Sequence, residues 1–150
     1  MPEWDSELEC FMAHWFSGLI KGLESVDQES REAILAECGK ACARSYTLQV
    51  FQGAKRRSAD LDAFLDHLAA KFPEAAYERL DAHTIRVTYV RCECDLVKCG
   101  LVSSPILCGC SARNLQENFC HSLGTPVSVT IEASILGGDP QCVFLVTLED

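Results

Sequence analysis

Five of the ten cysteines of this chain lie within one short stretch, residues 91–110. Four of them form two Cys-x-Cys pairs, Cys92/Cys94 and Cys108/Cys110. Thiolate ligands favour zinc or iron–sulfur clusters over magnesium or calcium, and a structural zinc ion takes four ligands in a tetrahedron. Residues i and i+2 of a strand point the same way. The two pairs therefore supply four candidate ligands for one metal ion, which we expect to be zinc rather than part of an iron–sulfur cluster.

A third cysteine pair lies far away in the sequence. Cys38 and Cys42 are spaced one helical turn apart and share a helix face with Ile34. We expect this face to point inward, so that both thiols line the same cavity as the other pairs or add ligands to the metal. Gly39, between them, costs the helix about 1 kcal/mol relative to alanine and would allow another element to approach closely. The alternative is that these cysteines pack as small hydrophobic residues.

A second interpretation of the stretch is nucleophilic. Cys110 directly precedes a predicted helix with Ser111 as its N-cap. The positive end of a helix dipole lowers the pKa of a thiol and favours the reactive thiolate. Cys110, or Cys108, would then be the nucleophile of a cysteine-dependent hydrolase acting on a small amide-like or heterocyclic substrate. A structural or interaction module with buried, unreactive cysteines is a third alternative. Disulfide exchange is disfavoured, because the chain has no Cys-x-x-Cys motif.

Hydrophobic periodicity predicts the elements that carry these residues. Apolar residues at helical spacing predict helices over about 5–22, 28–50, 59–72 and 111–123, separated by a basic linker at 52–58 and by a loop at 95–107. Alternating patterns predict strands over about 77–81, 84–91, 127–132 and 142–146, the last two joined by the turn Gly137–Pro140. Residues 142–146 are apolar on both faces, as expected of a central or covered strand.

These elements predict an α+β fold in one domain that spans residues 1–150. N-terminal helices (about 5–72) pack on an antiparallel sheet (within about 77–148), and one further helix precedes a C-terminal β-hairpin. We interpret Trp4 and Trp15 as packing residues or as part of a homodimer face.

Charge and hydropathy limit the partners. The net charge of -9 argues against nucleic acid and against an anionic membrane as partners. No apolar run approaches the roughly 18 residues of a membrane span, and the acidic start of the sequence does not resemble a signal peptide. We therefore expect a cytoplasmic protein, in which thiols stay reduced and clustered cysteines indicate metal or redox chemistry.

The sequence also resembles a known group. The segments Leu107–Ser111 (Leu-Cys-Gly-Cys-Ser) and Leu123–Val146 are similar to the C-terminus of the 4-vinyl reductase domains and of the L-2-amino-thiazoline-4-carboxylic acid hydrolase family. The matching residues include Gly137, Gly138, Asp139, Cys142 and Phe144, and the segments around Cys38–Arg44 and Arg91–Cys94 resemble a cysteine-rich branch of this group. The resemblance implies helices packed on an antiparallel sheet, an often dimeric protein and a small-molecule ligand, with cysteine and histidine as metal ligands.

Overall fold

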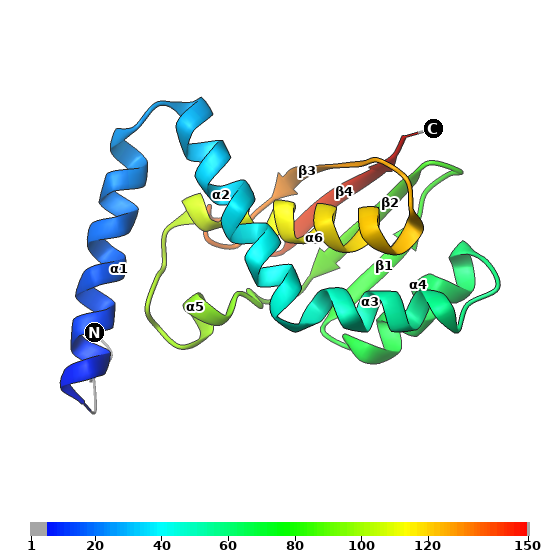
Figure 1. The fold of residues 1–150 in the computed structure, drawn as a ribbon, viewed down its shortest axis with the longest axis horizontal. Helices are drawn as coiled ribbons and strands as arrows, with labels where there is room; N and C mark the ends of the chain where they lie inside the picture. Colours follow the sequence, from blue (N-terminus) through cyan, green and yellow to red (C-terminus); the bar gives the residue numbers. More distant parts are fainter. Residues whose placement is uncertain (1–5, 150) are drawn as a thin grey trace.

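A four-stranded antiparallel sheet forms the centre of the computed structural model, which describes residues 6–149 (Figure 1). In the order β1-β2-β4-β3, the strands are β1 (Ala75–Arg79), β2 (Thr84–Tyr89), β4 (Cys142–Leu148) and β3 (Val127–Ala133). The apolar strand β4 is central, as predicted. Ile85 and Val87 of β2 pair with Val146 and Phe144 of β4, and all four side chains are buried on one face.

The helices precede the sheet, apart from those between β2 and β3. They are α1 (Glu7–Ser25), α2 (Gln28–Cys42), a π-helical turn (Ala43–Thr47), α3 (Leu48–Arg56), α4 (Leu61–Lys71), the short α5 (Asp95–Lys98), a 3-10 turn (Pro105–Leu107) and α6 (Cys108–Leu123). This arrangement confirms the predicted α+β class, including the helix before the C-terminal hairpin. No helix within residues 6–149 is long and apolar enough to cross a membrane.

The main core lies between the sheet and the helices α3, α4 and α6. Phe51, Phe64 and Phe119 come from these three helices and meet edge to face, with ring centroids 5.3 to 6.2 Å apart. Edge-to-face packing of buried rings adds about 0.5–1.5 kcal/mol per pair beyond the area buried. Helix α6 ends at Gly124 in the left-handed conformation (φ 69°), as predicted from the position of this glycine.

Several local predictions were wrong. The segment expected as a loop over 95–107 contains α5 and the 3-10 turn. The helix expected over 28–50 continues through the π-helical turn into α3, so most of the predicted linker at 52–58 is helical. The buried row of α2 is Leu35, Gly39 and, just beyond it, Ala43, one residue along from the expected row of Ile34, Cys38 and Cys42. Helix α6 begins at Cys108 rather than at Ser111, because the preceding 3-10 turn, capped by Ser104, runs directly into it.

Gly39 allows α2 to lie against α6. A Cβ atom at this position would stand 2.5 Å from Cβ of Arg113, 2.7 Å from the carbonyl oxygen of Cys110 and 2.9 Å from the amide nitrogen of Asn114. Two of these atoms belong to the backbone of α6, so no side-chain movement could relieve the overlap. The expectation that this glycine permits a close approach is confirmed, and the approaching element carries Cys108 and Cys110.

A second, smaller core joins α1 and α2 to the segment before α6. Ile20, Leu23 and Leu35 are buried there against Val102 and Leu107. The guanidinium of Arg31 fixes the corner between the two helices, donating to the carbonyl oxygens of Leu23, Glu24 and Val26 at 2.8–3.2 Å. Helix α1 therefore packs through one face only.

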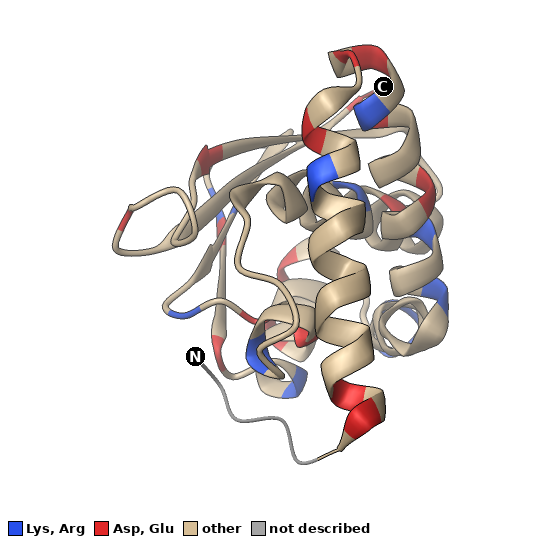
Figure 2. Cartoon of the chain, turned by 90° about the vertical axis from the view of Figure 1, so that its left-hand side faces the viewer, with Lys and Arg blue, Asp and Glu red and all other residues tan. Residues whose placement is uncertain are grey.

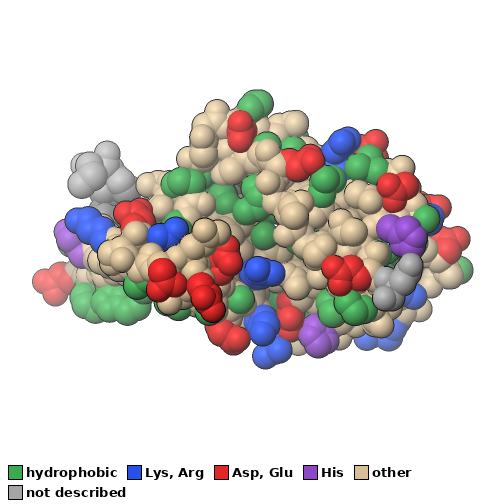
Figure 3. Space-filling view, turned by 90° about the horizontal axis from the view of Figure 1, so that it is seen from above, with side chains coloured by type: hydrophobic (Ala, Val, Ile, Leu, Met, Phe, Trp, Pro, Cys, Tyr) green, Lys and Arg blue, Asp and Glu red, His purple; other side chains and the backbone are tan. Residues whose placement is uncertain are grey.

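The other face of α1 is exposed and apolar. Between Glu9 and Lys21 the helix carries no Asp, Glu, Lys or Arg (Figure 2). Figure 3 shows hydrophobic side chains on the surface at the end of the molecule where α1 lies. Leu8, Phe11 and Trp15 of this helix are exposed. Trp4 lies outside the described residues.

The close approach of α2 and α6 predicts opposite effects for two glycine substitutions. Gly39→Ala should lower the free energy of unfolding by about 1–3 kcal/mol, because the added methyl group forces backbone displacement. Gly53→Ala in α3 should raise it by roughly 0.5–1 kcal/mol, because its Cβ would meet only the flexible ends of two arginines at 3.7–3.8 Å. Urea denaturation of the two variants and the native chain measures both. Equal effects would contradict the packing described.

Candidate functional site

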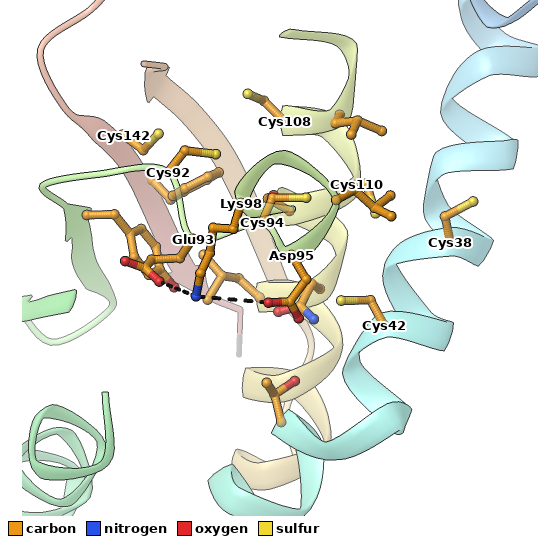
Figure 4. Close-up of a pocket in the computed structure, with 18 of the residues that line it drawn as sticks. Cys38, Cys42, Cys92, Glu93, Cys94, Asp95, Lys98, Cys108, Cys110 and Cys142 are labelled. Atoms are coloured by element: carbon orange, nitrogen blue, oxygen red, sulfur yellow. Dashed lines mark hydrogen bonds and ion pairs between the residues drawn. The ribbon is translucent and has the colours of Figure 1, made fainter. Parts of the chain in front are cut away.

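One cavity of about 370 Å³ lies between α2, α6, the sheet and the segment that follows β2 (Figure 4). Seven of the ten cysteines line it: Cys38, Cys42, Cys92, Cys94, Cys108, Cys110 and Cys142. All six cysteines proposed from the sequence are in this set, so the structure brings the three pairs to one site. Cys10, Cys99 and Cys120 lie elsewhere. The remaining walls are formed largely by apolar and aromatic side chains: Leu96, Leu107, Leu115, Leu136, Phe72, Phe144, Tyr46 and Tyr89.

The α2 wall presents Cys38 and Cys42 at the edge of the cavity. Both residues are exposed, unlike the inward-facing pair that was predicted, although the thiol of Cys42 is partly buried against the cavity. Figure 4 shows Cys42 directed from α2 toward the side of Asp95 and Cys110. The π-helical turn begins immediately after Cys42 and contributes Ser45, Tyr46 and Thr47 to the lining. Such turns occur often at functional sites.

The α6 wall is connected to the β3–β4 turn. The thiol of buried Cys108 lies 2.9 Å from the hydroxyl oxygen of Ser134. That hydroxyl also accepts the amide of Gly137 at 3.1 Å, and the amide of Ser134 donates to Asp139 at 2.8 Å. The Gly-Gly-Asp turn therefore positions a hydroxyl group against the first cysteine of the α6 pair.

Among residues 6–149, the charged side chains in the lining come from residues 74 and 93–98. Glu93 is largely buried and accepts hydrogen bonds from Arg91 at 2.6 Å and Lys98 at 3.2 Å. Lys98 also lies 4.0 Å from Asp95. Burial would raise the pKa of Glu93, but the hydrogen bonds from Arg91 and Lys98 outweigh it and hold that pKa below its usual range. Glu93 is therefore an ionised carboxylate beside an otherwise mostly apolar cavity.

Burial raises the pKa of the thiols of Cys42, Cys92, Cys108 and Cys110. For Cys110 burial is the largest cause, the neighbouring Cys42, Cys38 and Cys94 act in the same direction, and the pKa reaches about 12. The direction is opposite to the lowered pKa expected at the start of a helix, because burial is the largest influence on this thiol. The cysteine-hydrolase alternative loses its electrostatic basis.

The thiols that line the cavity are suitable ligands for a thiophilic metal, but they are not arranged in the geometry of a metal site. Thiols are the ligands that zinc and iron–sulfur clusters prefer. However, no group of three or more His, Cys, Asp or Glu side chains in the described chain is arranged to hold a metal ion. Zinc binding would require the thiols of α2, of the 92–94 segment and of α6 to move toward one another and to lose their protons.

Several residues of the site were not assigned a role from the sequence. Cys142 entered only as part of a family resemblance, and its strand pattern marked it as core. Its thiol accepts the amide of Ile135 at 3.4 Å and closes the cavity from the sheet side. The sequence marked Lys98 only as a charged residue within the predicted loop and Glu93 only as a charged residue just before it. Tyr89 follows the half-buried pattern of β2, and only the tertiary structure places it at the cavity.

Comparison with solved structures gives the fold. A trafficking protein particle complex subunit 3 from Naegleria fowleri, covalently bound to palmitic acid, is similar over 95% of each chain, with a TM-score of 0.59 and 12% identity. The phenol-responsive sensory domain of the transcription activator PoxR, with phenol, is similar over 91% of this chain and 74% of that chain, with a TM-score of 0.55 and 13% identity.

These similarities are at the level of architecture. No family model matches the sequence, and no curated protein matches it. This chain shares its fold with the trafficking subunit and with the sensory domain. The sensory domain has a 4-vinyl reductase-like fold. The resemblance to the 4-vinyl reductase group therefore extends to a distant relationship in fold.

The raised pKa values predict slow alkylation of the cavity thiols. At pH 8 iodoacetamide should modify Cys110 more slowly than exposed Cys10 and Cys99 by roughly one to two orders of magnitude, because less thiolate outweighs the greater nucleophilicity of a high-pKa thiol. Since the pKa is raised, the rate at Cys110 should keep increasing as the pH approaches about 12. Peptide mass spectrometry after timed quenching measures each site. Fast modification of Cys110 near neutral pH would restore the nucleophile hypothesis.

Proposed function

We propose that this chain is a small-molecule-binding domain whose ligand occupies the cysteine-lined cavity. The single observation that carries the proposal is the cavity itself, about 370 Å³ in volume and bounded by mostly apolar side chains from α2, α6, the sheet and the 92–98 segment. Ligand sites in proteins are typically concave, mostly apolar and supplied with a few polar groups.

The chemistry of the walls indicates the kind of ligand. Protonated thiols and the rings of Phe144 and Tyr89 favour an apolar or aromatic body. Glu93, Asp95 and Lys98 form one polar edge, so a ligand with an apolar body and one polar end would match both parts. The two similar structures support this proposal, because one holds phenol and the other palmitic acid.

A cavity-filling substitution tests ligand binding. Ser111 of α6 lines the cavity, and Ser111→Trp would fill part of it without removing a thiol. Isothermal titration with phenol and, separately, with palmitate should show binding of at least one compound to the native chain. Ser111→Trp should weaken that binding by about tenfold or more, a loss of roughly 1.4 kcal/mol. The two probes distinguish a compact aromatic ligand from a long acyl chain.

Ser17→Trp is the matched control, since residue 17 is exposed on α1 and is not among the residues that line the cavity. It should bind the same probe within about twofold of the native chain. Circular dichroism verifies that both variants are folded, and Ser111→Leu serves if the larger residue is not tolerated. Binding of neither probe, or equal binding by all the variants, would refute the proposed site.

A second candidate function is metal binding by the same cavity. The specific observation in its favour is the gathering of seven cysteines from four separate parts of the chain. In this proposal zinc is held by thiolates drawn from Cys92, Cys94, Cys108, Cys110, Cys38 and Cys42, with the loop before α6 adjusting to close the coordination shell. Bound zinc would stabilise the fold, because an ion that binds only the native state adds its binding free energy to folding.

Elemental analysis of protein purified without added metal tests this candidate. Native protein should retain close to one equivalent of zinc, and the double variant Cys94→Ala/Cys110→Ala should lose it. Cys10→Ala/Cys99→Ala, which removes two thiols outside the cavity, should keep it. A native content below about 0.2 equivalents of zinc or iron, together with freely titratable thiols, would reject the metal site.

A further inference from the structure

The exposed face of α1 has an organised pattern. Leu8, Phe11 and Trp15 are 65%, 62% and 55% exposed, which is unusual for three large apolar side chains on one helix. Their spacing continues through Gly18 and Gly22. With Ser25, the six positions alternate steps of three and four residues, which is the a/d repeat of a helix that pairs with another helix.

The part of the chain that the structure describes offers no packing reason for the two glycines. Both are exposed, and a Cβ atom added at either position would meet nothing within 4 Å. This is the opposite of Gly39, where α6 leaves no room. Each glycine inside a helix costs about 1 kcal/mol relative to alanine. A partner that approaches α1 from outside would account for both.

Side-chain size varies systematically along this a/d seam, which is formed by residues 8, 11, 15, 18, 22 and 25. Its N-terminal half is large, with Leu8, Phe11 and Trp15, and its C-terminal half is small, with Gly18, Gly22 and Ser25. The hydroxyl of Ser25 donates back to the carbonyl oxygen of Gly22 at 2.8 Å and so does not project from the helix. The seam therefore offers knobs at one end and holes at the other.

A two-fold axis near the middle of α1 would bring these halves together. In an antiparallel pair with the axis between residues 15 and 18, Trp15 lies opposite Gly18, Phe11 opposite Gly22 and Leu8 opposite Ser25. Every large side chain then faces a small residue. A parallel pair would place Trp15 against Trp15 and leave the glycines facing one another across a gap.

We propose that α1 is a homodimer interface in which a second copy of this chain docks its own α1 antiparallel through this seam. The area is consistent with a weak dimer. Aromatic side chains bury 150–250 Å² each, so the exposed parts of Leu8, Phe11 and Trp15 contribute roughly 300–400 Å² per protomer. That is about half of the ~800 Å² per partner in a standard interface. The dissociation constant is accordingly expected in the micromolar range.

The charge on the helix disfavours a membrane as the occupant. Besides the seam, α1 carries Glu7, Glu9 and Glu24 against Lys21 alone. An anionic lipid surface would repel this set, and amphipathic helices that bind such surfaces are rich in Lys and Arg. A second copy of the chain requires no basic face.

Sedimentation equilibrium of the full chain in reducing buffer tests the interface. The native protein should pass from monomer to dimer as its concentration rises through the micromolar range. Gly18→Leu should weaken the association by about tenfold or more, because it fills the hole that receives Trp15 of the second copy. Trp15→Glu should weaken it similarly. Ser17→Leu, off the seam on the same helix, should leave it within about twofold.

Gly18→Leu separates this proposal from simple apolar adhesion. The substitution adds exposed apolar surface and removes a helix-weakening glycine, so non-specific association would become stronger. Circular dichroism confirms that each variant is folded. A native chain that stays monomeric at high micromolar concentration, or a dimer that Gly18→Leu leaves unchanged or strengthens, would overturn the proposed interface.

Discussion

The close contact between α2 and α6 at Gly39 is the constraint on which the site depends. Without a Cβ at residue 39, the two helix backbones come near enough for the thiols of Cys38 and Cys42 to share a cavity with Cys110. A wider helix separation would divide the cysteines into two unrelated groups. Cys142 of β4 lines the cavity on the side of the sheet. The β3–β4 turn holds Cys108 in place through the contact between its thiol and the hydroxyl of Ser134. Gly39 thus allows the cysteines of the N-terminal helices to reach the cysteine-lined cavity.

Loss of solvation sets the character of this chemistry. Four thiols in a mostly apolar cavity have raised pKa values, so they are protonated near neutral pH and behave as polarisable apolar groups. An apolar ligand would encounter this state directly. A metal ion would first have to displace protons, and its uptake would therefore depend strongly on pH. The two proposed functions use the same residues in different protonation states, which gives them different dependences on solvent acidity.

The sequence predicted the structure best where one hydrophobic periodicity, helical or alternating, extended over a whole element. Alternation identified the strands and the central place of β4, and Gly39 and Gly124 were interpreted correctly because each had a local physical reason. The inward face of α2 was misassigned, because a thiol that borders a cavity has the same hydrophobic signature as one that fills a core. Ser111 was expected as an N-cap, but the 3-10 turn begun by Ser104 had already started the helix. Glu93 and Lys98 contact each other locally along the chain, but only the tertiary structure places them beside the cavity.

The wall of the cavity formed by residues 94–107 belongs to a different core from the rest. It packs with α1 and α2 around Ile20, Leu23 and Leu35, whereas the sheet, α3 and α4 share the phenylalanine core. Segments with few buried apolar contacts open at a lower free energy than the main core, so we expect the smaller core to open locally before the larger one. Amide hydrogen exchange in this segment would then be faster than in β4. Entry of a ligand into the cavity would then depend on a local opening equilibrium. For a ligand that binds only the open form, the apparent affinity equals the intrinsic affinity multiplied by the fraction of open molecules.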